Sequence, residues 1–273
     1  GAAIMISESP LKEGLIFVST DDGVINITED GGSNWRRVEK FRGVPDMSYI
    51  DDVLASSHDE NIAYAVFDNH KRGDYKPYIL KTEDRGKSWK SIAGNLPQRG
   101  SAHTIVEDHV NPNLLFAGTE FGLFFTQDGG GNWTRLKSNF PTTAVRDIEI
   151  QKRENDLVVG TFGRGIYILD DYSALRTKKS DLGAEMLFPV RDPWLYIEGD
   201  LWDAREKGSM GAEFFTSKNP SFGAVFTYYL KDGVKSRQSA RREAEIEIEK
   251  TGGNTPYPTW DVLREEDQEE SPG

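Results

Sequence analysis

Carboxylate side chains lie in β-rich segments of this 273-residue chain, and a pair of carboxyls is what hydrolysis of a glycosidic bond requires. Asp51 and Asp52 are adjacent in one such segment, and Asp147 lies in a later one. Two carboxyls roughly 5–5.5 Å apart hydrolyse the bond with retention of configuration at the anomeric carbon. A separation of roughly 6.5–9.5 Å gives inversion of that configuration. These three aspartates are therefore candidate catalytic residues. The alternative is that they cap turns or pair with arginines.

A second set of polar side chains is suited to binding a ligand. The segment 68–75 is the best candidate for a binding loop, because long loops on a rigid scaffold often carry function. The four histidines have no metal-ligand spacing and no glycine loop has phosphate-binding form, so we expect no metal and no cofactor. The candidate ligand-binding residues are His70, Arg72, Tyr75, His103, Glu120, Arg146 and Arg164.

A repeated motif predicts the scaffold that positions these residues. Three copies of Thr-x-Asp-x-Gly-x-(Asn/Ser)-Trp occur, and their aspartates are 54 and 44 residues apart. This period matches a four-stranded propeller blade of roughly 40–50 residues. Asp can accept backbone hydrogen bonds in a turn, Gly supplies positive φ and Trp opens the next strand. We therefore assign a structural role to Asp30, Gly32, Trp35, Asp84, Gly86, Trp89, Asp128, Gly130 and Trp133.

A second repeat runs in phase with the first. The segment 115–124 resembles 157–167, and each contains an apolar strand, a glycine-bearing turn and another apolar strand. Residues 1–173 thus hold about four blades, the first incomplete at its start, in a closed ring or part of a larger one. The inner strands that line the channel are expected at Tyr49–Val53, His103–Asp108 and Val145–Glu149. The fold class is all-β, with propeller blades and an irregular, partly helical C-terminal extension.

The motif resembles the Asp-box (BNR) repeats of sialidases, xyloglucanase-like glycosidases and sortilin-type receptors. In that family the boxes lie on peripheral turns, away from the central pocket. No sialidase arginine triad can be assigned, and Phe41-Arg-Gly-Val44 is not the sialidase segment, so this activity is not supported. The chain is similar to the C-terminal part of large bacterial secreted BNR-repeat or sortilin-like glycosyl hydrolase proteins. The segments that carry this likeness are 118–122, 153–157, 160–165 and 219–230.

This resemblance implies a secreted or periplasmic module that binds carbohydrate or peptide or acts as a scaffold. A glycoside hydrolase with a channel-facing carboxylate pair is the alternative, and a peptide receptor would use Arg146 or Arg164 to take a carboxylate. Open blade edges could also join two copies into a homodimer.

The C-terminal third departs from the blade pattern. We expect an extended connector at 174–212 and a truncated β-sandwich-like or strand-plus-helix segment at 213–273. Gly223–Leu230 is predicted as a strand from its β-branched and aromatic residues. Residues 236–250 fit either a surface helix or, from the alternation at Glu245–Glu249, a strand. A short helix is expected to start near Pro258.

Composition excludes several classes of partner. The net charge of −12 argues against nucleic acid, whose phosphates need clustered Lys and Arg. No stretch approaches the roughly 20 apolar residues of a membrane span. The chain has no cysteine, so it has neither a disulfide framework nor a thiolate zinc site.

Overall fold

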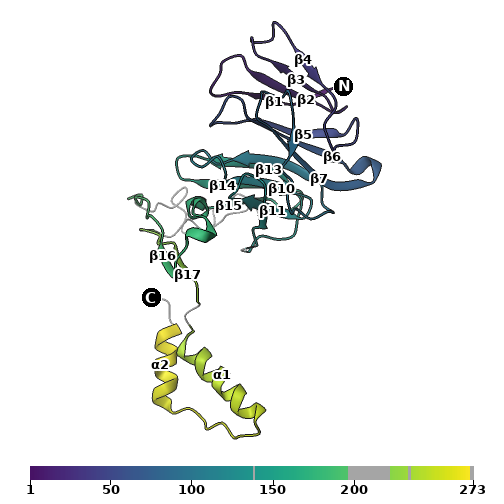
Figure 1. Ribbon diagram of the computed structural model, residues 1–273. Coiled ribbons are helices and arrows are strands. Elements are labelled where there is room, and N and C mark those ends of the chain that lie inside the picture. The colour runs from purple at the N-terminus through teal and green to yellow at the C-terminus, as the bar shows by residue number, and fades with distance from the viewer. Residues whose placement is uncertain (138, 196–221, 233–234, 271–273) are drawn as a thin grey trace, which may run out of the picture. The chain divides into compact units, whose positions relative to one another are not determined.

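The computed structural model describes residues 1–137, 139–195, 222–232 and 235–270 (Figure 1). By its internal contacts the chain divides into two units, Gly1–Lys178 and Lys179–Gly273. The predicted boundaries at 173 and 212 remain predictions, and the second falls outside the described residues. None of the described helices is long and apolar enough to span a membrane.

The first unit is built from four antiparallel sheets, in each of which every strand pairs with the next in the chain. Three sheets have four strands and the last has three, so the expectation that the first blade is incomplete was wrong. The strands are, in the first sheet, β1 (Ala3–Glu8), β2 (Ile16–Thr20), β3 (Ile25–Thr28) and β4 (Arg36–Val38); in the second, β5 (Tyr49–Ala55), β6 (Ala63–Asn69), β7 (Asp74–Thr82) and β8 (Lys90–Ser91); in the third, β9 (Ala102–Glu107), β10 (Leu115–Thr119), β11 (Gly122–Thr126) and β12 (Trp133–Arg135); and in the fourth, β13 (Val145–Gln151), β14 (Asp156–Thr161) and β15 (Ile166–Leu169).

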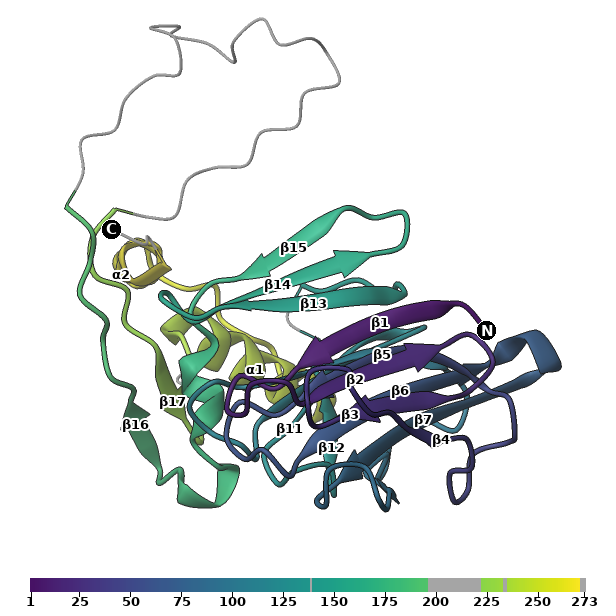
Figure 2. The same cartoon turned by 90° about the horizontal axis from the view of Figure 1, so that it is seen from above.

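The first strands of successive sheets lie against one another, β1 beside β5, β5 beside β9 and β9 beside β13. The predicted inner strands are therefore confirmed as β5, β9 and β13, although the second prediction runs one residue past the end of β9, and the sheets fan outward from them (Figure 2). Apolar side chains at alternate strand positions fill three clusters, one between each pair of neighbouring blades. Phe17, Phe67 and Phe116 are among the fully buried side chains, and burial of this kind is the main stabilising term.

The three motif turns share one hydrogen-bond pattern. In each, the Thr hydroxyl donates to the Asp carboxylate at 2.7–2.8 Å. The carboxylate also accepts the backbone N–H four residues on, at 2.8–2.9 Å, and that residue's side chain. In Asp30 the bonds from Asn34 dominate and lower the pKa to about 2. Burial raises the pKa of Asp84 and Asp128, but the hydrogen bonds outweigh it and lower each to about 2.

The tryptophans of these motifs differ in burial. Trp89 and Trp133 are buried in the clusters between blades, and Trp133 Nε1 donates to the Ile92 carbonyl at 2.8 Å. Trp35 is 49% exposed, and its Nε1 donates to Gly32 within its own turn. Packing against a preceding blade therefore holds for the second and third copies only.

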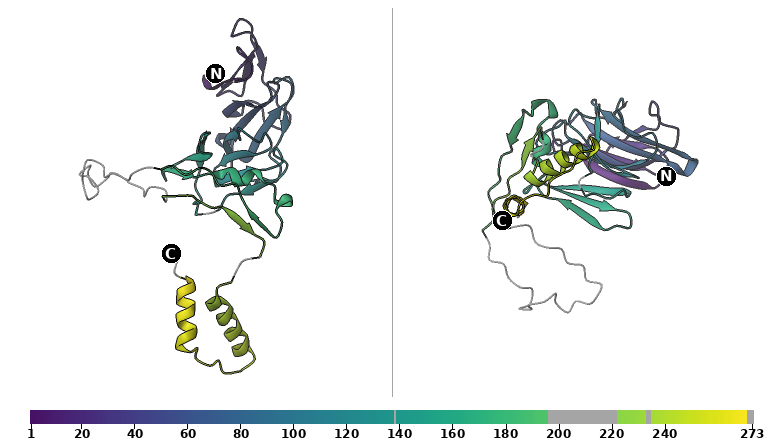
Figure 3. Two further views of the ribbon diagram at one scale, coloured as in Figure 1. Left: turned by 90° about the vertical axis from the view of Figure 1, so that its left-hand side faces the viewer. Right: turned by 90° about the horizontal axis from the view of Figure 1, so that it is seen from below.

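In the second unit, β16 (Glu185–Leu187) pairs with β17 (Tyr228–Leu230), so only the end of the predicted strand 223–230 is a strand. Residues 237–250 form helix α1 (Arg237–Lys250), because the Ser236 hydroxyl caps it by accepting the Ser239 N–H. The alternative strand there was wrong. Helix α2 (Trp260–Glu270) extends further than the short helix expected and lies beside α1 (Figure 3). Three short 3-10 segments complete the elements: η1 (His70–Arg72), η2 (Tyr172–Arg176) and η3 (Lys179–Asp181).

Candidate functional site

Each inner strand of the first unit contains one extra residue near its start. In β5, Ile50 and Asp52 pair with adjacent residues of β6, which leaves Asp51 without a partner in the ladder. The same skip occurs at His103 in β9 and at Arg146 in β13. A bulge of this kind re-aims the side chain of the extra residue, and bulges are frequent beside functional sites. Three successive blades thus each present one polar side chain at the same place.

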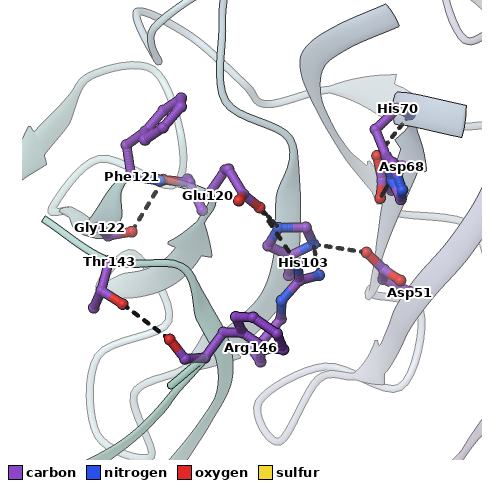
Figure 4. Close-up of polar contacts among 11 residues, drawn as sticks. Asp51, Asp68, His70, His103, Glu120, Phe121, Gly122, Thr143 and Arg146 are labelled. Atoms are coloured by element: carbon purple, nitrogen blue, oxygen red, sulfur yellow. Dashed lines mark hydrogen bonds and ion pairs between the residues drawn. The ribbon is translucent and has the colours of Figure 1, made fainter. Parts of the chain in front are cut away.

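These three side chains contact one another (Figure 4). His103 lies in the middle, and its side chain is only 3% exposed. Its Nδ1 lies 2.9 Å from Asp51 Oδ2 and 3.1 Å from Arg146 Nη1, and its Nε2 lies 3.0 Å from Glu120 Oε2. Glu120 belongs to the turn between β10 and β11, in the same blade as His103. The result is a polar chain that crosses three blades.

A cavity of about 590 Å³ opens over this chain of side chains. One side is formed by η1 and the start of β7, and the other by the β10–β11 turn and β13. Tyr75 and Phe121 are each about half exposed, at 53% and 51%, and place two aromatic side chains in the cavity wall. The full lining is His70, Tyr75, Arg99, Gly100, Ser101, His103, Glu120, Phe121 and Arg146.

A buried carboxylate, Asp68, lies beneath one wall. Its two oxygens contact the backbone N–H and the Nδ1 of His70. Burial alone would raise the pKa of Asp68, but the hydrogen bond from the His70 N–H and the neighbouring side chains outweigh it and hold the pKa below its usual value. Asp68 therefore remains an anion inside the protein and fixes η1 at the rim of the cavity.

The structure brings most of the predicted ligand-binding residues together. His70, Tyr75, His103, Glu120 and Arg146 all line the cavity. The other two lie elsewhere. Arg72 donates from Nη1 to the Asp46 carbonyl at 2.6 Å, and Arg164 is exposed between β14 and β15.

The three predicted catalytic aspartates separate. Asp51 contacts His103, as described above. Asp52 is buried between blades and accepts from Thr104 Oγ1 and the Ile105 N–H, both at 3.0 Å. Burial raises its pKa to about 6. Asp147 is exposed and accepts the N–H of the next residue, Ile148.

Sequence reasoning did not select Arg99 or Ser101, and it included Asp68 only as the first residue of the segment 68–75. Phe121 was noted only as the neighbour of Glu120 in its turn. Ser101 lies two residues before His103, and the period of two along a strand could have pointed to it. We find no sequence signal for Arg99.

No protein-family model matches this chain. A xyloglucanase from Hypocrea jecorina (strain QM6a) is 25% identical to it over 146 residues, which cover 47% of this chain and 17% of that protein. Among solved structures, the GH74 enzyme of Niastella koreensis superposes with a TM-score of 0.50 at 13% identity, covering 64% of this chain and 29% of that one. The blades are those of a β-propeller.

A further solved structure, YCF48 bound to a D1 peptide, superposes with a TM-score of 0.48 at 17% identity and covers 62% of this chain. This chain spans about half of that protein's length and under a third of the two proteins above. At these identities the structural likeness concerns the fold.

Proposed function

We propose that this chain is the propeller module of a secreted or periplasmic bacterial Asp-box protein, and that it binds a carbohydrate in the cavity above His103. The single observation that carries this is the lining of the cavity. Two half-exposed aromatic rings, Tyr75 and Phe121, flank a fixed set of charged groups. Aromatic faces pack on the apolar faces of sugar rings, and fixed carboxylates and guanidinium groups bond their hydroxyls.

Size and relationship both support a sugar ligand. The cavity volume of about 590 Å³ lies within the roughly 300–1,000 Å³ typical of small-molecule sites. A xyloglucanase of Hypocrea jecorina matches 47% of this chain in sequence, so xyloglucan oligosaccharides are the first ligands to test. The predicted homodimer stays a prediction.

Binding fits the carboxylates better than hydrolysis does. A general acid needs a raised pKa and must face the substrate. Asp52 has the raised pKa, but it is buried between blades and does not line the cavity. Asp68 lies close to Asp51, but its pKa is lowered, so it holds no proton to donate near neutral pH. We therefore favour a binding module over a glycoside hydrolase.

The test is calorimetric titration of the full chain with xyloglucan and cello-oligosaccharides, with a peptide library as the competing ligand class. We expect saturable binding of an oligosaccharide, weakened at least tenfold by Phe121→Ala and by Tyr75→Ala. Tyr257→Ala is the matched control, because Tyr257 is 86% exposed and lies in the second unit. Binding of peptides alone, or oligosaccharide binding that both cavity variants leave unchanged, would overturn the proposal.

Hydrolysis is measured in the same samples as released reducing ends. We expect none above the buffer rate. Release that Asp51→Asn abolishes would instead establish the glycoside hydrolase.

A further inference from the structure

Three ligand-type side chains meet beneath the cavity although they are far apart in the chain. Asp51, Asp68 and His103 each offer one ligand atom, and these three atoms all lie within 4.8 Å of one another. They come from β5, β6 and β9, so rigid strands rather than loops hold them. Three ligand atoms that each lie about 2.0–2.2 Å from one tetrahedral cation are roughly 3.4 Å apart. From separations of at most 4.8 Å, movements of about an ångström or less per side chain would therefore bring all three onto one ion.

With Arg146 in its present position, the contacts of His103 cannot all be satisfied at once. A neutral imidazole has one donor nitrogen and one acceptor nitrogen. When Nε2–H donates to Glu120, the lone pair on Nδ1 faces the Asp51 oxygen at 2.9 Å, which places two acceptors against each other. When both nitrogens carry protons, Nδ1–H faces the Arg146 guanidinium at 3.1 Å. In the remaining tautomer the Nε2 lone pair faces the Glu120 oxygen and Nδ1–H faces Arg146, so each protonation state leaves at least one unfavourable contact.

A cation between Nδ1 and the two carboxylates removes this conflict. The ring then donates Nε2–H to Glu120, which is how metal-bound histidines are usually oriented by a neighbouring carboxylate. Arg146 can move away from Nδ1, because its side chain is 44% exposed and already lies 3.5 Å from Glu120 Oε2. The geometry thus contains ligands, an orienting carboxylate and a displaceable positive charge.

Ser101 supplies an independent observation. It is 2% exposed and lines the same cavity, and its hydroxyl has no hydrogen-bond partner of normal geometry among the described residues. It lies near Asp68, but no hydrogen bond of normal geometry joins the two side chains. A buried hydroxyl without a partner costs free energy. A cation, or a water molecule bound to one, would give this hydroxyl its missing partner.

We propose that Asp51, Asp68 and His103 bind one divalent transition-metal cation, Zn²⁺ or Mn²⁺. Two carboxylate oxygens with one imidazole nitrogen suit these ions, because imidazole favours Zn²⁺ over Mg²⁺ and Ca²⁺ and carboxylates accept Mn²⁺. His103 also lines the cavity, so water or a ligand hydroxyl there could complete the coordination. The inference does not rest on carbohydrate binding, since the test reads the metal alone.

The experiment titrates the tag-free full chain, stripped with a chelator, with Zn²⁺ or Mn²⁺ in competition with a chromophoric chelator. We expect one equivalent to bind with a micromolar or lower Kd, and Mg²⁺ to bind at least 100-fold more weakly. His103→Gln and Asp68→Asn should each weaken binding at least 100-fold. Asp46→Asn is the matched control, because Asp46 is exposed and outside the cavity lining, and it should leave the Kd unchanged.

A second measurement does not depend on the folding of the variants. Zn²⁺ added to the wild-type chain should shift the ring NMR signals of His103, and those of His70 through its contact with Asp68, and leave those of His58 and His109 in place. Binding of several equivalents, binding that His103→Gln does not weaken, or a Zn²⁺ titration that leaves the His103 signals unmoved would overturn the proposal.

Discussion

Asp108 is the buried carboxylate whose removal should destabilise the first unit most clearly. It follows β9 and has no solvent exposure. It accepts from Tyr172 Oη at 2.6 Å and from Arg176 Nε and Nη2 at 2.9 and 2.8 Å. Both donors belong to η2, which follows the last blade. The contacts therefore fasten the end of the first unit to its third blade.

We expect Asp108→Asn to lower the free energy of unfolding by about 3 kcal/mol. Removing one partner of a buried ion pair costs roughly 3–5 kcal/mol, because the other charge stays uncompensated. The Arg176 side chain is 20% exposed, so water can partly solvate it and the lower end of that range applies. The asparagine side chain keeps one acceptor oxygen, but its NH₂ group takes the place of the other. That group then faces Tyr172 or Arg176, which are themselves hydrogen-bond donors. Tyr172→Phe removes the hydrogen bond to Asp108 and a longer contact with His109 Nδ1, and should cost about 1–1.5 kcal/mol.

The assay is urea unfolding of the full chain at neutral pH, followed by circular dichroism of the β-sheet signal. Arg176→Met should be as damaging as Asp108→Asn, since it leaves the buried carboxylate without its cation. Arg153→Gln is the control, because its ion pair with Glu154 lies on the surface and should change stability by less than about 0.5 kcal/mol. Losses below about 1 kcal/mol for both Asp108→Asn and Arg176→Met would refute the reasoning.

Two further predictions concern the blades. Gly118→Ala should destabilise the chain by about 1–3 kcal/mol, because its Cβ would lie 2.6 Å from Val145 Cγ1 and 2.9 Å from the Val145 carbonyl of the next blade. Gly160→Ala meets nothing closer than 3.6 Å and should be neutral by the same urea assay; equal losses for the two would contradict the packing argument. The motif aspartates, with pKa values lowered to about 2 in the fold, should stabilise it above pH 4 and lose that contribution as pH falls from 4 toward 2. Asp84→Asn should flatten the fall in melting temperature over this range, and an unchanged slope would count against the hydrogen-bonded turn.

The blades could be predicted from sequence because their determinants are local. Each motif turn is closed by bonds between residues at most four positions apart, such as Asp128 to Asn132. The inner strands could also be predicted, since β-branched residues such as Val53 in β5 and Ile148 and Ile150 in β13 mark these segments. The number of strands in each sheet was harder to predict. Strand β1 carries no motif, and no sequence pattern marks its pairing with β2.

The candidate site was harder to predict because it depends on contacts between blades. Glu120 and His103 could be placed on one rim from their positions in turn and strand. The orientation of the Arg72 side chain could not be predicted, because it depends on a hydrogen bond to the carbonyl of Asp46, which is far away in the sequence. Asp68 and Ser101 are buried by neighbours from other strands, and no local pattern states that.

The bulges explain why two adjacent aspartates have different environments. Asp51 is the extra residue of β5 and turns to His103, whereas Asp52 rejoins the ladder and points between blades. Even in a regular strand, Asp51 and Asp52 would point to opposite faces of the sheet. Alternation alone does not explain why the extra residue occurs at the equivalent position in the next two blades, at His103 and Arg146.

Equivalent positions in successive blades, when compared, distinguish residues that the fold requires from residues that are candidates for contacting a ligand. The motif positions hold the same residue types in three blades, as expected where each blade needs the same turn. The bulge position holds Ile4, Asp51, His103 and Arg146 in successive blades, so four equivalent places carry four different chemistries. A fold that needed one residue type there would repeat it. The variation is what a site requires, because a ligand or a cation must be contacted by different groups from different sides.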